Sequence, residues 1–175
     1  MSEDFTGKTV LVTGGNSGIG RGIAQRFARA GAYVIIVARD PEKGAAVVAE
    51  IGEERAEFHS VELSREDAVV HLLQKIENKF QHLDVLVNNA GLGSRRSGIA
   101  PDDGPGERWN KIRGANLDAT FFLSAHALPL LAHAASGAIV NISSNSSLRG
   151  QAHNCGQSAH HSYSYSCLHY CSSPG

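Results

Sequence analysis

The chain has 175 residues, a length from which we expect one domain and which excludes a two-domain enzyme. Hydrophobic residues make up 42% of the chain and charged residues 19%, which excludes a compositionally disordered protein. The 16 Lys and Arg residues against 17 Asp and Glu give a formal net charge of -1, so no basic surface for nucleic acid is expected.

The N-terminus carries acids and lacks a basic segment followed by a long apolar run, so we expect no secretory signal. The longest apolar runs are a few residues, whereas a membrane span needs about 20. The sequence therefore predicts a cytoplasmic protein with no membrane partner.

Short β-branched runs alternate with longer amphipathic segments between Lys8 and Ser144. This order is typical of an α/β protein, a three-layer doubly wound parallel sheet of the Rossmann type. In chain order, the pattern predicts a strand over 8–13, a helix over 18–30, a strand over 33–38, a helix from Pro41, a strand over 56–63, a helix ending at Phe80, a strand over 83–88, a loop over 91–106, a helix over 107–132 and a strand over 137–143. Ser64-Arg-Glu-Asp67 has the layout of a capping box for the helix that ends at Phe80.

The periodicity stops after Gly150. Residues 151–175 contain no charged side chain but hold all 3 Cys and four of the 9 His. We therefore expect residues 1–150 to form the folded domain and residues 151–175 to be an aberrant low-complexity tail. The cysteines and histidines are ligand types that zinc prefers, but paired Cys-x-x-Cys spacing is lacking, so no metal site is predicted.

A glycine-rich turn, Thr13-Gly-Gly-Asn-Ser-Gly-Ile-Gly20, lies where the first predicted strand ends and the first helix begins. Glycines let the backbone approach a pyrophosphate, and the helix N-terminus offers free N–H groups to an anion. Such a turn alone can be only a tight connection, whereas its place in a βαβ unit favours a dinucleotide site.

Four motifs in a fixed order make the sequence resemble the classical short-chain dehydrogenase/reductase family. They are Thr13-Gly14-x-x-x-Gly18-x-Gly20, Asn88-Asn89-Ala90-Gly91, Asn116 within Ala-Asn-Leu, and Ile139-Val-Asn-Ile-Ser-Ser144. The resemblance implies an NAD(P)-dependent oxidoreductase that transfers hydride between NADP(H) and a small-molecule carbonyl or alcohol. Family members form homo-oligomers through the long helix and a later Tyr-Lys helix, and only the first is expected here, so the resemblance predicts no definite oligomer for this chain.

The resemblance also implies which residues bind the cofactor. Ala38 stands where NAD-preferring relatives carry an acid, and Arg39 follows it; a guanidinium can pair with a ribose phosphate, so NADP is favoured over NAD. The alternative that Arg39 is only a solvated loop charge stays open. Glu62-Leu63 resembles the family's Asp-hydrophobe pair that contacts adenine. The predicted cofactor-binding residues are Gly14, Asn16, Ser17, Gly18, Ile19, Gly20, Arg39, Glu62, Leu63, Asn89, Ala90 and Gly91.

For catalysis the resemblance implies Ser144, which would hold the substrate oxygen, and Asn116, which would support a water relay. The family's Tyr and Lys, four residues apart, are absent, because the last Lys of the chain is Lys111. Tyr165 has His169 at the Lys spacing, but an imidazole is mostly neutral at pH 7 and is a poor substitute. We therefore expect this chain to be inactive or nearly so, with a fold that is incomplete at its C-terminal end and an exposed fifth strand.

Two hypotheses for the chain stay open, besides metal binding by the tail, which the cysteine spacing disfavours. In one, the body encodes a short-chain reductase and the reading frame shifts near Gly150, just before the expected Tyr-Lys helix. In the other, the protein is a non-catalytic NADP-binding pseudoenzyme or sensor.

Overall fold

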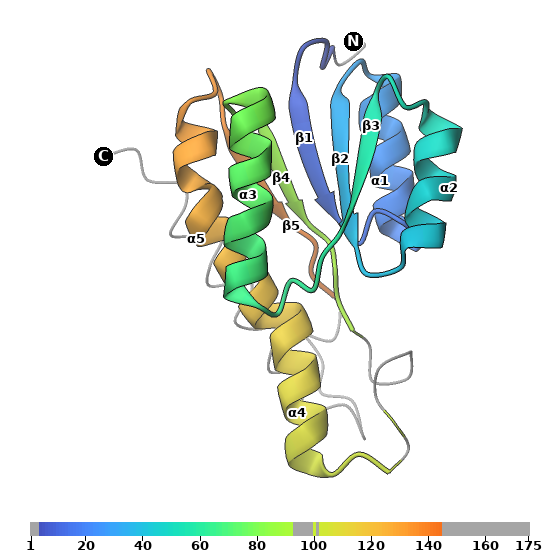
Figure 1. The fold of residues 1–175 in the computed structure, drawn as a ribbon, viewed down its shortest axis with the longest axis vertical. Helices are drawn as coiled ribbons and strands as arrows, with labels where there is room; N and C mark the ends of the chain where they lie inside the picture. The colour runs from blue at the N-terminus through green and yellow to red at the C-terminus, as the bar shows by residue number, and fades with distance from the viewer. Residues whose placement is uncertain (1–3, 93–99, 101, 145–175) are drawn as a thin grey trace.

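The structure is a computed structural model, and it describes residues 4–92, 100 and 102–144. Within these residues five parallel strands form one sheet in the order β3-β2-β1-β4-β5 (Figure 1). The strands are β1 (Thr9–Thr13), β2 (Tyr33–Ala38), β3 (Ala56–Ser60), β4 (Val85–Asn88) and β5 (Ala138–Asn141). The chain builds the sheet outward from β1 in one direction and then returns to β4 on the other side. In open α/β sheets ligands bind at this switch point, outside the carboxyl ends of the strands.

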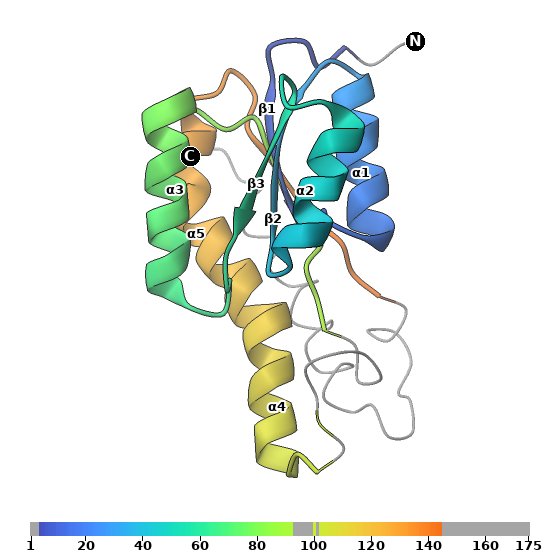
Figure 2. The ribbon, with the colours of Figure 1, turned by 45° about the vertical axis from the view of Figure 1, so that its right-hand side comes forward.

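Helices cover the sheet on both faces (Figures 1 and 2). One face carries α1 (Gly18–Arg29) and α2 (Pro41–Ile51), and the other carries α3 (Glu66–Phe80) and α5 (Ala119–Ala132). A further helix, α4 (Pro105–Arg113), continues through a π-helical segment, Gly114–Asp118, into α5. The predicted three-layer doubly wound fold is confirmed.

The two cores follow from the alternation of side chains along each strand. Leu11, Ile35 and Leu86 face α3 and α5, whereas their neighbours Val12 and Ile36 face α1 and α2. All five side chains are fully buried, with 0% of their surface exposed. Strands buried on both faces must be apolar at nearly every position, which explains the near-continuous apolar runs in the sequence.

Several predicted features differ from the structure. The third strand ends at Ser60, because its ladder with β2 ends at the pair Ala38 and Ser60. The capping box is not formed: α3 begins at Glu66, and the Ser64 hydroxyl donates to Glu62 Oε1 at 3.0 Å instead of to the helix. The long helix begins at Pro105, a residue that suits the first helical turn, and the π-helical segment interrupts it.

At the edge of the sheet, an apolar side chain of β5 and one just after it are in contact with solvent. Val140 is 42% exposed and Ile142 is 36% exposed. Residues 145–175, which include the predicted tail, and half of the predicted loop over 91–106 lie outside the described residues. In the described part of the chain, no helix is long and apolar enough to cross a membrane.

Candidate functional site

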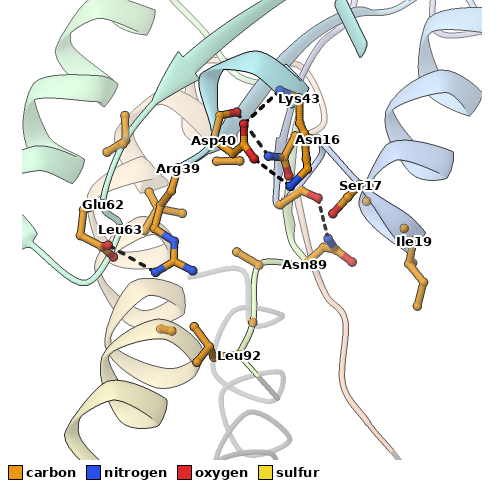
Figure 3. Close-up of a pocket in the computed structure, with 18 residues that line it drawn as sticks. Asn16, Ser17, Ile19, Arg39, Asp40, Lys43, Glu62, Leu63, Asn89 and Leu92 are labelled. Carbon is orange, nitrogen blue, oxygen red and sulfur yellow. Dashed lines mark hydrogen bonds and ion pairs between the residues drawn. The ribbon is translucent and has the colours of Figure 1, made fainter. Parts of the chain in front are cut away.

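A cleft of about 660 Å³ lies at the carboxyl ends of β1, β2 and β4 (Figure 3). All the residues predicted to bind a cofactor line it, although they come from four separate segments of the chain. Six further residues complete the described lining: Ala38, Asp40, Lys43, Val61, Leu92 and Ala115. The structure therefore brings the predicted cofactor-binding residues together in one place.

The turn between β1 and α1 has the backbone geometry that only glycine adopts readily. Gly14 and Gly18 have φ angles of 64° and 53°, in the left-handed region. Ser17, at the N-cap of α1, makes no side-chain cap hydrogen bond, and the first turn of α1 holds no acidic residue. The N-terminus of α1 therefore offers an anion its backbone N–H donors and the positive end of the helix dipole.

Gly20 allows α1 to approach the turn closely. A β-carbon at Gly20 would overlap the carbonyl oxygen of Gly14 and the side-chain amide of Asn89. Asn89 Nδ2 in turn donates to the Thr13 carbonyl oxygen at 2.9 Å. The turn, α1 and the segment after β4 thus form a cradle of backbone atoms, which fits a pyrophosphate.

Thr13, the last residue of β1, fixes the segment after β4. Its side chain is buried, and Oγ1 accepts from the backbone N–H groups of Asn89 and Ala90, both at 2.9 Å. The same hydroxyl donates to the Val87 carbonyl oxygen at 3.3 Å. Thr13 was quoted in the first motif but not predicted as a site residue. It does not line the cleft and acts by holding the residues that do.

At the far end of the cleft two cations each face a carboxylate (Figure 3). Arg39 Nη1 lies 3.8 Å from Glu62 Oε2, and Lys43 Nζ lies 2.8 Å from Asp40 Oδ2. The hydrogen bonds and charge of Lys43 hold the pKa of the Asp40 carboxyl below its usual value. Asp40 in turn raises the pKa of Lys43. Sequence reasoning missed Lys43, although its place in the first turn after Arg39 was a usable signal.

Asn116 lies in the π-helical segment and is 7% exposed. Its Oδ1 accepts from the Leu92 backbone N–H at 2.6 Å, and its Nδ2 donates to the Leu92 carbonyl oxygen at 3.1 Å. Its own carbonyl oxygen accepts from the Thr120 hydroxyl at 2.9 Å. The side chain of Asn116 therefore positions the chain that follows β4, and the catalytic role of Asn116 stays a prediction.

The other predicted catalytic residue, Ser144, is half-buried beyond the end of β5 and is not among the described residues that line the cleft. Lys111 is held on α4 by Asp103 at 2.8 Å and by Glu107 at 2.9 Å. Tyr165 and His169 lie outside the described residues. The catalytic role of Ser144 is likewise a prediction that the geometry leaves untested.

Known proteins are similar to this chain both in sequence and in fold. A 3beta-hydroxysteroid dehydrogenase of Mediterraneibacter gnavus is 42% identical over 149 residues, which are 83% of this chain and 52% of that protein. A putative short chain dehydrogenase of Escherichia coli is 29% identical at a TM-score of 0.84, covering 96% of this chain and 75% of that one. A metagenomic short-chain oxidoreductase in complex with NADP is 35% identical at a TM-score of 0.80, and the match covers 89% of this chain and 71% of that one.

The chain spans about half the length of the curated relatives it matches. The family model described as short chain dehydrogenase matches residues 8–160 and so includes every element described above. The matched residues include the glycine-rich turn, the cradle and all five strands, and these relatives agree with the match in sequence and in fold. The chain belongs to the short chain dehydrogenase family.

Proposed function

We propose that this chain binds a nicotinamide dinucleotide, NADP(H) in preference to NAD(H), in the cleft at the carboxyl ends of β1, β2 and β4. The observation that carries the proposal is that every residue predicted to bind the cofactor lines this one cleft. In the proposed domain organisation, residues 1–150 form the binding domain and residues 151–175 do not contribute to it.

The glycine cradle suits the pyrophosphate. The N-terminal N–H groups of α1 lie at the turn without a competing side-chain cap, and Gly20 lets α1 pack closely against the turn. In this proposal Asn89, Ala90 and Gly91, held by Thr13 and Asn116, lie along the cofactor on the β4 side.

The cations at the far end suit a ribose phosphate. Arg39 is half-exposed at the end of β2, where its guanidinium can bind a phosphate with two parallel hydrogen bonds. Lys43 lines the same end and supplies a second positive charge. Ala38 leaves no carboxylate at the position from which NAD-preferring relatives bind the ribose hydroxyls.

The reaction type that we propose from the family's chemistry is reduction of a carbonyl or oxidation of an alcohol. A bound nicotinamide supplies or accepts the hydride. On the protein side, Ser144 is proposed to hold the substrate oxygen, and Asn116 to position the segment along the cofactor. A proton donor with a lowered pKa is also needed, and the chain offers no Tyr-x-x-x-Lys after Ser144. We therefore propose that the 175-residue chain binds cofactor without turning over substrate. This suits a non-catalytic NADP-binding protein as well as a reductase whose reading frame shifts near Gly150.

Calorimetric titration of the 175-residue chain with NADPH and with NADH tests the cofactor. We expect tighter binding of NADPH, and we expect Arg39→Met to weaken it by about tenfold, because a charged hydrogen bond contributes roughly 1.5 kcal/mol. NADH binding should change little. Arg55→Met is the matched control, because Arg55 is an equally exposed arginine outside the cleft. Absence of binding by both cofactors would contradict the proposal.

Spectrophotometric assays with aldehydes and ketones test the absence of turnover. NADPH bound but not oxidised is the expected result, and measurable carbonyl reduction would contradict it. Translation of the other two reading frames of the gene beyond Gly150 then separates the two explanations. A Tyr-x-x-x-Lys in one of them favours the frameshift, and its absence from both favours the sensor.

A further inference from the structure

The ion pair between Arg39 and Glu62 ties the cation that we assign to the ribose phosphate to a carboxylate of the protein itself. The two side chains come from different segments, one after β2 and the other after β3. Their charged atoms lie 3.8 Å apart across the end of the cleft, and both line it (Figure 3). A phosphate that binds Arg39 must therefore share the guanidinium with Glu62 or displace it.

Glu62 is held in this position from its other side. Glu62 Oε1 accepts from the Ser64 hydroxyl at 3.0 Å and from the Ser64 backbone N–H at 3.4 Å. These bonds leave Oε2 as the oxygen that faces Arg39. The Ser64 hydroxyl that does not cap α3 thus has a second role, since it orients the carboxylate toward the cofactor cleft.

The second pair at this end is built differently. Asp40 pairs with Lys43, and Asp40 Oδ1 also accepts from the Lys43 backbone N–H at 3.1 Å as the N-cap of α2. Movement of the Asp40 side chain away from Lys43 would cost the helix its cap. Glu62 caps no helix in the described residues and is 46% exposed. Of the two carboxylates, Glu62 is the one that can give way to a ligand.

We propose that Glu62 determines cofactor selectivity: its carboxylate neutralises Arg39 in the free protein and competes with the 2′-phosphate of NADP(H), whereas NAD(H) leaves the pair intact. This inference rests on the proposed binding of NADP(H) in the cleft. Removal of the charge should strengthen binding of a 2′-phosphate and leave binding of a ligand without it unchanged. The pair is exposed, so the expected change in affinity is about two- to fivefold.

Adenosine fragments test this without the nicotinamide half of the cofactor. We suggest calorimetric titration of the 175-residue chain with 2′,5′-ADP, which carries the 2′-phosphate, and with 5′-AMP, which does not. Glu62→Gln should bind 2′,5′-ADP about two- to fivefold more tightly than the wild type does, and 5′-AMP equally well. The amide keeps an acceptor for an adenine amino group, so a contact of Glu62 with adenine alone would leave the ratio of the two affinities unchanged.

Two further variants sharpen the result. Ser64→Ala keeps the carboxylate but frees it from its anchor, and it should raise the ratio by a smaller factor than Glu62→Gln does. Glu53→Gln removes an exposed carboxylate outside the cleft and should leave the ratio unchanged. Thermal unfolding of each variant checks that the fold is intact.

The outcomes separate this inference from the proposed function. A ratio that is unchanged or lower in Glu62→Gln overturns the selectivity role, even when the wild type prefers 2′,5′-ADP. A wild type that binds neither ligand overturns the cofactor site and this inference together. A ratio that rises in Glu62→Gln and stays constant in Glu53→Gln supports both.

Discussion

Gly20 lies so close to the carbonyl oxygen of Gly14 that no side chain fits between them. Gly14 belongs to the turn after β1, and Gly20 belongs to the first part of α1. The side-chain amide of Asn89, from the segment after β4, closes the same space. The missing β-carbon at Gly20 therefore sets the distances among three segments that meet at the cleft.

Gly20→Ala should disturb both stability and binding. The new methyl group must push α1 outward or displace Asn89, and overpacking of this kind costs about 1–3 kcal/mol of unfolding free energy. NADPH binding should also weaken, because α1 and Asn89 no longer hold the turn in place. We expect a loss of roughly tenfold, which corresponds to about 1.4 kcal/mol of binding free energy. Urea unfolding and calorimetric titration measure the two effects.

Gly22→Ala is the matched control for this substitution. Gly22 lies in the same helix but is exposed, and a β-carbon there would meet no atom within 4 Å. Alanine in a helix interior is favoured over glycine by about 0.5–1 kcal/mol, so this variant should be more stable and bind NADPH as the wild type does. Equal loss of binding in both variants would show that the packing argument is wrong.

Thr13→Val should destabilise the segment after β4 although the two side chains have nearly the same shape. Valine cannot accept the hydrogen bonds that Thr13 Oγ1 receives from the N–H groups of Asn89 and Ala90. Leaving such groups without a partner costs about 1–3 kcal/mol. Thr13→Ser keeps the oxygen and should retain most of the stability and the binding. Urea unfolding of the three proteins compares them, and equal loss in both variants would point to the methyl group instead.

The fold and the lining of the cleft could be predicted because both depend on local patterns. Apolar runs such as 33–38 mark buried strands, and the alternation of strands with helices limits the sheet to a few arrangements. The carboxyl ends of parallel strands then meet at one edge, so motifs that follow β1, β2 and β4 must lie close together. The resemblance supplied the residues, and the topology explains why they converge.

The details that could not be predicted depend on contacts between distant segments. Ser64 has the residue type of an N-cap, yet its hydroxyl bonds to Glu62, and no local rule distinguishes the two partners. Asn116, in the π-helical segment, is hydrogen-bonded to Leu92, which lies 24 residues earlier in the chain, and no local pattern predicts that contact. The pair of Arg39 and Glu62 likewise joins two loops whose distance only the folded sheet defines.

Asn116→Ala should loosen the chain that follows β4 without unfolding the protein. The substitution leaves the backbone N–H and carbonyl of Leu92 without their partners, which costs about 1–3 kcal/mol. Hydrogen exchange at the Leu92 amide should become faster, and NADPH binding should weaken. Asn110→Ala, an exposed asparagine of α4, is the control and should change neither. Unaltered exchange at Leu92 in Asn116→Ala would contradict the positioning role.

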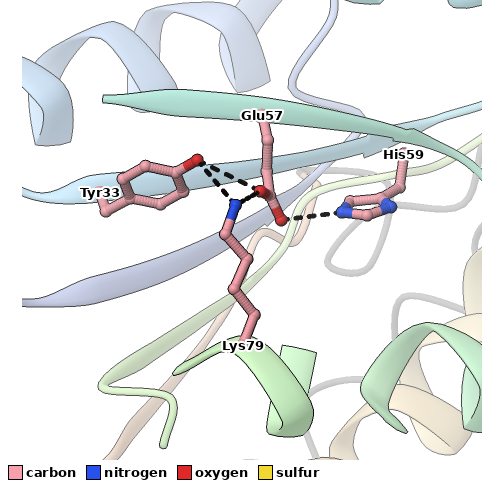
Figure 4. Close-up of polar contacts among 4 residues, drawn as sticks. All are labelled: Tyr33, Glu57, His59 and Lys79. Atoms are coloured by element: carbon pink, nitrogen blue, oxygen red, sulfur yellow. Dashed lines mark hydrogen bonds and ion pairs between the residues drawn. The ribbon is translucent and has the colours of Figure 1, made fainter. Parts of the chain in front are cut away.

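Away from the cleft, four side chains of β2, β3 and α3 share one polar cluster (Figure 4). Glu57 contacts His59 at 2.9 Å, accepts from the Tyr33 hydroxyl at 3.2 Å, and forms an ion pair with Lys79. The hydrogen bond from His59, and the hydrogen bond and charge of Lys79, outweigh burial and lower the pKa of Glu57 from 4.5 to about 2. The cluster thus holds Glu57 in its ionised form.

This depressed pKa predicts an acid-dependent loss of stability. A carboxyl whose pKa is lower in the folded state stabilises the fold fully above its unfolded pKa of 4.5, and the contribution is lost as the pH falls toward about 2. Because the cluster is partly exposed to solvent, we expect about 1–2 kcal/mol rather than the full value of the shift. Urea unfolding from about pH 6 to about pH 3 should show the wild type losing its advantage over Glu57→Gln. The exposed Glu53→Gln should keep a constant difference from the wild type over that range, and a constant difference for Glu57→Gln as well would contradict the role of the cluster.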